Sequence, residues 1–282
     1  MAKSRSSGAL GLGLLFATGI HWLGATLAPA IAQDEAASLY QCRAIVTGTD
    51  AERRVPNMID CFKRTMVKVS GDQRLLDDRT LNPPIGLVLA AVEKLTLRDR
   101  LWRRPIHDEQ GTRDRPHDLI VNFKQADIDN MLAKFGRKPW PEPRPSVAMV
   151  LLVRHGDNPF ILSSDGDRGP GMTESMADAS DRLGLNGIVP SQQDLKAAGM
   201  DVPAATRPVA KMLAAVAKSA GADAAVSGIM TWSDSGFGWN AQWSMTANGE
   251  KTTWHTEGVN FDQAFRIGLG GAAQILSGNV QP

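Results

Sequence analysis

The sequence predicts an α+β fold built from two small domains. Three observations support this prediction. The C-terminal third alternates apolar and polar residues over three successive segments, which is the pattern of a three-stranded antiparallel meander. Apolar residues at helical spacing flank these segments and indicate amphipathic helices that cover the sheet. A proline-rich stretch separates these elements from an earlier region of strands and helices.

The first domain is expected at residues 33–138. Its first strand is predicted at 40–47, where Gln41, Arg43, Ile45 and Thr47 form one side of the alternation. A helix follows, with Pro56 suited to its first turn and Gly71 to its end. Further elements are a helix at 84–95, paired strands at 101–106 and 119–123, and a helix at 127–135.

The connection at 139–145 is expected to be stiff and extended. Four prolines lie within 138–145, and proline continues neither a helix nor a central strand. The boundary between the two domains is therefore predicted at this connection.

The second domain is expected at residues 146–282. The meander comprises segments at 224–232, 239–246 and 252–256, and Asn248-Gly249 marks a hairpin turn between the last two. A helix at 261–276 is expected to cover its apolar face. The earlier elements of this domain are strands at 146–153, 159–163 and 187–190 and helices at 172–183 and 209–220.

Residues 1–32 have the three-part plan of a secretory signal peptide. Lys3 and Arg5 precede an apolar run, and Ala30-Ile31-Ala32 is a small-x-small cleavage pattern. Cleavage is expected after Ala32; a retained membrane anchor is the alternative reading. No cysteine lies beside this position, so a lipid anchor is not expected, and the protein is predicted to be periplasmic without a membrane span in its mature chain.

Export places Cys42 and Cys61 in an oxidising compartment, which predicts a disulfide between them. Two thiols without a neighbouring histidine make a metal site at this place a poor alternative. Removing Lys3 and Arg5 changes the formal charge from +1 to −1. This near-neutral balance argues against a nucleic-acid partner, which favours a basic excess.

The segment Arg154-His155-Gly156 follows a predicted buried strand and resembles the opening of histidine phosphatases. There the histidine attacks phosphorus and the arginine stabilises the charge on the phosphoryl oxygens. Such an enzyme needs a second histidine, and His255 is the only later one. The alternative is a capped turn at the end of a buried strand, and we regard the phosphatase as the weaker reading.

The segment 107–118 is rich in histidine and charge. It could ligate a metal, form a loop that pairs its own charges, or bind a partner. Its charge density makes it the predicted partner surface, comprising His107, Asp108, Arg113, Asp114, Arg115 and His117. Asp165-Gly166-Asp167 is similar to the start of a calcium loop, but the later ligand positions are absent, which favours a turn.

Four tryptophans share one face of the predicted meander: Trp232, Trp239, Trp243 and Trp254. Such a row could stack sugars, so binding of a glycan such as peptidoglycan is an alternative function. Core packing beneath the last helix is the favoured interpretation. No phosphate cradle, nucleophile elbow or Cys/His dyad is present, so no catalytic residue and no cofactor is predicted.

Several segments resemble a family of exported Gram-negative proteins, the domain of unknown function 2066. They are YQCRAIVTG at 40–48, VKVSGD at 67–72, HDEQGTRDRPHDLIVNF at 107–123, Lys138-Pro139-Trp140 and Arg144-Pro145. The resemblance implies an envelope location and no defined activity. The C-terminal half is similar in element order to small periplasmic α+β domains such as the N-terminal domain of TolB, which act through protein contacts. The expected function is a non-enzymatic envelope protein that binds another protein or assembles a complex.

Overall fold

The computed structural model describes residues 39–77, 81–103 and 114–279. The predicted signal peptide with its cleavage position lies outside this range, as do His107, Asp108 and Arg113 of the predicted partner surface. The described chain is α+β, as the sequence predicts.

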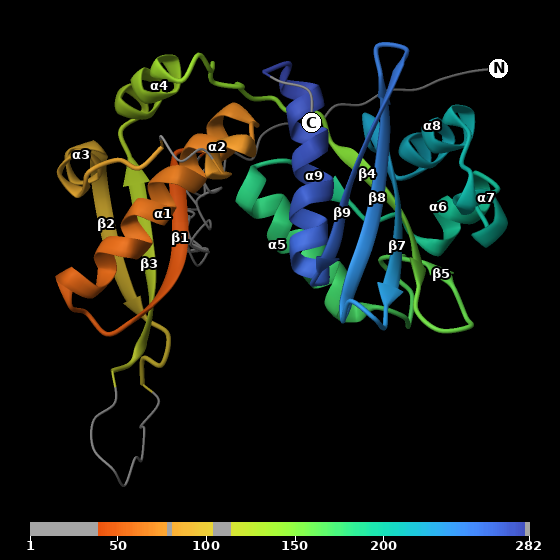
Figure 1. The fold of residues 1–282 in the computed structure, drawn as a ribbon, viewed down its shortest axis with the longest axis horizontal. Helices are drawn as coiled ribbons and strands as arrows, with labels where there is room; N and C mark the ends of the chain where they lie inside the picture. The colour runs from red at the N-terminus through yellow and green to blue at the C-terminus, as the bar shows by residue number, and fades with distance from the viewer. Residues whose placement is uncertain (1–38, 78–80, 104–113, 280–282) are drawn as a thin grey trace, which may run out of the picture. The chain divides into compact units, whose positions relative to one another are not determined.

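The N-terminal half contains a three-stranded antiparallel sheet in the order β1-β3-β2. Helix α1 crosses one face of this sheet (Figure 1). The strands are β1 (Gln41–Thr47), β2 (Val92–Asp99) and β3 (Pro116–Phe123). The helices are α1 (Ala51–Ser70), α2 (Arg74–Asp77), α3 (Ile85–Ala91) and α4 (Gln125–Lys134).

Helix α1 begins earlier than Pro56, which lies inside it. Asp50 caps the helix, because its carboxylate accepts hydrogen bonds from the backbone N–H groups of Glu52 and Arg53 at 2.7 and 3.2 Å. Gly71 ends it in the left-handed conformation, with φ of 77°. The predicted disulfide is confirmed: Cys42 of β1 is bonded to Cys61 of α1, with Cα atoms 5.5 Å apart.

Two predicted elements of this half differ in part from the structure. The helix predicted at 84–95 ends at Ala91, and strand β2 follows at once. Pairing with β3 decides this, since Leu95 and Leu97 alternate in register with Val121 and Leu119. The strand predicted at 101–106 is a turn over its described residues, where the Asp99 carboxylate accepts a hydrogen bond from the N–H of Leu101 at 2.8 Å.

The predicted meander is present but belongs to a larger sheet. Its strands are β7 (Ala224–Ser233), β8 (Gly238–Ala247) and β9 (Glu250–Val259). Strand β4 (Val147–Arg154) pairs parallel to β7 and extends the sheet, which also includes β5 (Phe160–Ile161) and β6 (Gly187–Ile188). Seven of the eight residues of β4 are buried, which suits a strand covered on both faces.

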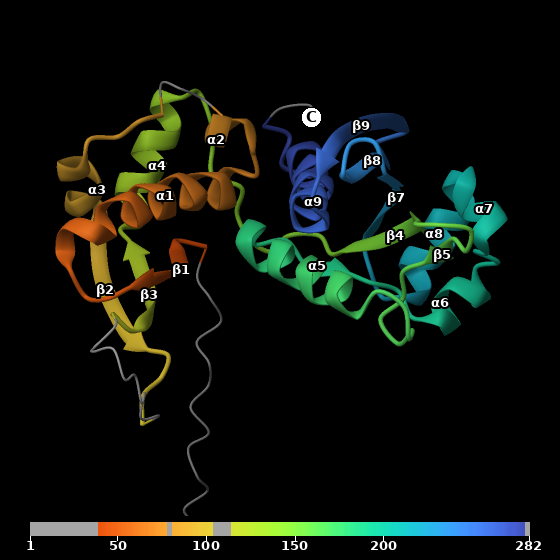
Figure 2. The ribbon, with the colours of Figure 1, turned by 60° about the horizontal axis from the view of Figure 1, so that its bottom comes forward.

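Helices cover both faces of this six-stranded sheet (Figures 1 and 2). On one face lie α5 (Pro170–Leu183) and α9 (Phe261–Ser277), which pack against each other. On the other lie α6 (Gln192–Ala197), α7 (Val202–Thr206) and α8 (Ala210–Ser219), which bury Val150 and Leu152 of β4. The two short helices α6 and α7 were not predicted, because segments of this length are too short to show a clear helical period.

Segment 139–145 connects α4 to β4 without helix or strand. The division into two domains at this segment stays a prediction. Buried apolar residues of both sheets belong to one continuous cluster. Within the described ranges, no helix combines the length and apolar character needed to cross a membrane.

Candidate functional site

One face of the three-stranded sheet is covered by α1, and the other carries no described helix. Directly opposed residues share a face, so the register places Ile45, Asp118 and Arg98 in one row and Arg43, Ile120 and Thr96 in the next. Side-chain interactions agree with this register: Arg98 pairs with Asp118 at 3.3 Å in the first row, and Gln41 donates a hydrogen bond to Asn122 at 2.9 Å in a third row on the same face. We call this uncovered side the open face.

Ile45 is the notable residue of the open face, because 58% of its surface is exposed. Its strand neighbours Cys42 and Val46 are buried on the other side, against α1. The sequence already held the signal, since Ile45 stands on the more polar side of the alternation in this strand. Ile45 is therefore an exposed apolar side chain on the face opposite α1.

The open face has a positive balance of charge. Arg43, Lys94 and Arg98 are exposed on it. Its acid Asp118 is already paired with Arg98 at 3.3 Å and with Arg100 at 3.5 Å. The described side chains around Ile45 therefore carry a net positive charge.

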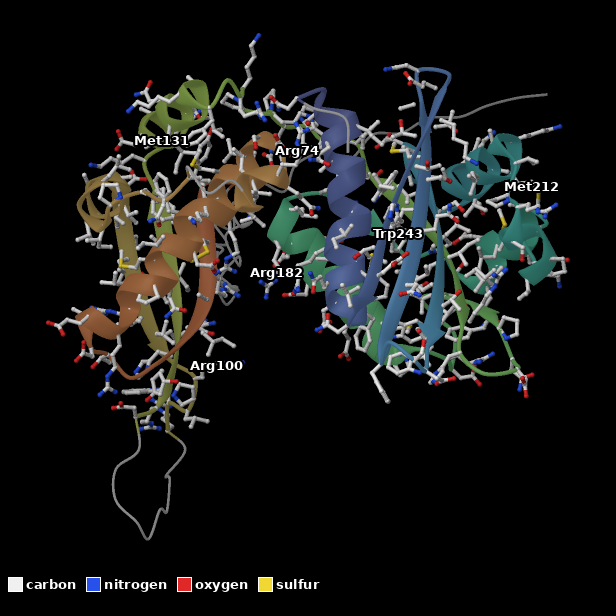
Figure 3. The ribbon with its side chains drawn as sticks, in the orientation of Figure 1. Arg74, Arg100, Met131, Arg182, Met212 and Trp243 are labelled. Carbon is white, nitrogen blue, oxygen red and sulfur yellow. A yellow bond between two sulfur atoms is a disulfide. The ribbon has the colours of Figure 1, made fainter. Side chains whose placement is uncertain are left out.

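The end of the β2–β3 hairpin adjoins this face, and Arg100 marks it in Figure 3. Trp102 lies there with 72% of its surface exposed. Tryptophan and arginine are the residue types that dominate protein interfaces energetically. Sequence reasoning placed Trp102 inside a strand and so missed it as a candidate contact residue.

The described residues of the predicted partner surface are held by local interactions. Asp114 pairs with Arg53, and Arg115 pairs with Asp99 at 3.2 Å. His117 lies within 2.8 Å of the Arg115 carbonyl oxygen through Nδ1. These interactions order the base of the hairpin, and Trp102 is an exposed apolar side chain among its described residues.

His155 lies exposed at the end of β4, against the rings of Trp232 and Trp239 at centroid distances of 5.6 and 5.7 Å. Arg154 donates a hydrogen bond to the Thr206 hydroxyl at 3.3 Å. His255 is on β9, three strands away in the order β4-β7-β8-β9, which corresponds to about 14 Å of strand spacing. The fold does not bring the two histidines together.

Asp165 has a local structural role, because its carboxylate accepts a hydrogen bond from the N–H of Gln192 at 2.8 Å. Across residues 39–77, 81–103 and 114–279, no three His, Cys, Asp or Glu side chains are grouped as a metal site would require.

Three of the four meander tryptophans are buried: Trp239, Trp243 and Trp254 keep 6, 1 and 8% of their surface exposed. The ring of Trp243 lies between the sheet and α9 (Figure 3). The favoured core interpretation is therefore confirmed for these three rings. Trp232 is half-buried, and its Nε1 donates a hydrogen bond to Asp234 at 2.9 Å.

A buried cluster of polar side chains lies where α1 ends. The buried Asp72 carboxylate accepts hydrogen bonds from Gln274 of α9 at 2.9 Å and from Arg137 at 2.5 Å. Burial opposes its ionisation, but the bonds from Gln274 and Arg137 outweigh that effect and lower the pKa of Asp72. This cluster ties the N-terminal half to α9.

Arg144 ties the ends of two helices together. Its guanidinium donates hydrogen bonds to the carbonyl oxygens of Lys68, at the end of α1, at 2.8 Å and of Leu183, at the end of α5, at 3.1 Å. It also stacks on the Trp140 ring at 4.4 Å. Burial lowers its pKa to about 10, so it stays charged at neutral pH.

Tyr40 completes this region by donating a hydrogen bond to Asp129 at 2.9 Å. Burial and that bond raise the pKa of Tyr40 to about 12. Tyr40, Asp72 and Arg144 lie in the segments 40–48, 67–72 and 144–145, which carry the resemblance described above. All three side chains connect separate parts of the chain through hydrogen bonds.

Comparison with known proteins adds no relative. No protein-family model, no curated protein and no solved structure matches this chain.

Proposed function

We propose that this chain is a non-enzymatic protein-binding or assembly factor of the bacterial cell envelope, and that it contacts its partner through the open face and the adjoining hairpin end. The observation that carries the proposal is the exposed Ile45 within a positively charged sheet face. Trp102 extends the same surface with an aromatic group of the kind that anchors protein interfaces.

The periplasmic location is part of this proposal. The Cys42–Cys61 disulfide supports it, because disulfides persist in oxidising compartments and are rare in the cytosol. The resemblance to exported envelope proteins points the same way. N-terminal sequencing of the protein from a periplasmic extract tests the location; a mature start at Gln33 is the expected result.

The binding proposal is tested by photo-crosslinking in intact envelopes. A photoreactive residue replaces Ile45 in one variant and Val209 in a matched control, since these two β-branched residues are 58 and 56% exposed. Position 45 is expected to yield one specific protein adduct that position 209 does not. Capture of the same proteins from both positions would contradict the proposal.

A second pair of variants measures the energetic contribution of the hairpin end. Trp102→Ala is compared with Phe237→Ala, because both rings are highly exposed, at 72 and 86%, and lie in turns next to strands of different sheets. Loss of an interface tryptophan typically weakens binding by about 2 kcal/mol, or roughly thirtyfold. Equal effects of the two substitutions on partner recovery would remove Trp102 from the binding surface.

A further inference from the structure

Strand β1 is an edge of its sheet with an ordered set of outward backbone groups. The Tyr40 carbonyl accepts a hydrogen bond from Phe123, and the Gly48 N–H donates one to Arg115, each at 2.9 Å. Even-numbered backbone groups between these residues therefore point toward β3, and odd-numbered ones point outward. Within the described residues, β1 has no second strand neighbour.

The opposite edge of the same sheet is protected, whereas β1 is not. Strand β2 carries a register shift between Val92 and Lys94 and is rich in charge, and both features discourage pairing with another strand. Strand β1 has no register shift and no proline, and Arg43 is its one charged residue. The contrast marks β1 as the edge able to accept a strand.

The disulfide prepares this edge for binding. Cys42 anchors β1 to α1, so the strand loses little conformational freedom when a partner pairs with it. Arg64 of α1 approaches the outward carbonyl of Arg43 at 3.5 Å, the long limit of a hydrogen bond. That weak contact can be exchanged for a backbone bond from an added strand.

The side chains of β1 specify what the added strand contains. Arg43 and Ile45 are both exposed and lie two positions apart on the open face. In an added strand, the residues beside them on that face are also two positions apart. An acidic residue complements Arg43, and an apolar residue covers Ile45.

We infer that β1 binds an extended segment of another protein by strand addition, and that the segment carries an acidic residue two positions from an apolar one. This inference rests on the proposed function and assigns its mode of recognition. Strand addition supplies affinity through backbone hydrogen bonds and specificity through alternate side chains.

The test uses two ten-residue synthetic peptides with threonine at alternate positions. One carries glutamate and valine two positions apart; the other has lysine in place of glutamate. Backbone hydrogen exchange of the intact chain is followed by NMR with each peptide. The glutamate peptide is expected to slow exchange roughly tenfold at Arg43, Ile45 and Thr47. Ala44 and Val46 already bond to β3, so their rates should not change.

Three variants sharpen this test. The Arg43→Glu variant is expected to lose binding of the glutamate peptide and to bind the lysine peptide instead. Lys94→Glu, on the protected edge of the same face, should leave both results unchanged. Thr47→Pro removes one outward N–H and leaves the hydrogen bonds to β3 in place. It should therefore weaken binding of the glutamate peptide.

The outcomes separate this inference from the proposed function. Specific crosslinking from position 45, together with unchanged amide exchange at Arg43, Ile45 and Thr47 when the peptide is added, would overturn strand addition. The proposed binding face would still stand in that case. Equal binding of both peptides would overturn the acidic specificity. Protection that appears without peptide and grows with protein concentration would mean that β1 pairs with a second copy, which also overturns the inference.

Discussion

The side-chain amide of Gln274 donates a 2.9 Å hydrogen bond to the carboxylate of Asp72, although 202 residues separate the two positions. Asp72 is fully buried, and Arg74 and Arg137 also pair with it at 3.3 and 2.5 Å. A buried carboxylate with this many donors is a specific tie between the end of α1 and α9.

Asp72→Asn is expected to destabilise the chain by about 2 kcal/mol at neutral pH, because it removes charge-assisted hydrogen bonds. The pKa of Asp72 is lowered in the folded state. Its contribution is therefore present above the unfolded pKa of 3.8 and is lost as pH falls below that value toward the folded pKa. Urea unfolding from pH 7 to pH 3 measures both effects. The difference in unfolding free energy between wild type and Asp72→Asn should become smaller below about pH 4. A difference that does not change with pH would contradict this expectation.

Arg144→Lys is expected to destabilise the chain by roughly 1–3 kcal/mol, although charge is retained. A lysine ammonium cannot reproduce the planar fork that donates to Lys68 and Leu183. Hydrogen exchange at the ends of α1 and α5 should accelerate in this variant. Arg182→Lys is the control, because Arg182 pairs with Asp178 on the exposed surface of the same helix, and this substitution should change stability by less than about 0.5 kcal/mol.

Gly268→Ala should destabilise α9 packing by roughly 1–3 kcal/mol. A Cβ at this position would lie 2.7 Å from the Trp243 ring, which is fully buried and unable to move aside. Gly86→Ala is the matched helical control, since nothing lies within 4 Å of its added Cβ, and it should stabilise by about 0.5 kcal/mol. Thermal unfolding of both variants tests this, and a neutral Gly268→Ala would argue against the tight contact.

Replacing Cys42 and Cys61 together by alanine should cost about 3 kcal/mol of stability, because the bridge closes a loop spanning 19 positions. Intact mass should rise by about two protons on reduction. Thiol labelling of the unreduced protein should find no free cysteine. Two freely labelled cysteines would also weaken the support for an oxidising location.

The candidate surface was only partly accessible to sequence reasoning. Asp114, Arg115 and His117 were chosen for charge density, and the structure shows Asp114 and Arg115 in ion pairs with Arg53 and Asp99. Ile45 was visible as an isoleucine on the polar side of its strand, but alternation alone cannot say whether a further helix covers that side. Trp102 was assigned to a strand because the β2–β3 pairing was placed too late in the chain.

Several local elements were predictable from the sequence alone: the α+β class, the strand at Gln41–Thr47, the meander at 224–259 and the helix that covers it. Periodicity, turn residues and the disulfide requirement act over a few residues to a few tens, so they can be read from the chain directly. Three features required the folded structure: the parallel pairing of β4 with β7, the burial of Asp72 against α9, and the exposure of Ile45 on a face that no described helix covers. These features depend on contacts between distant segments, whose partners are selected by packing of the whole chain rather than by local pattern.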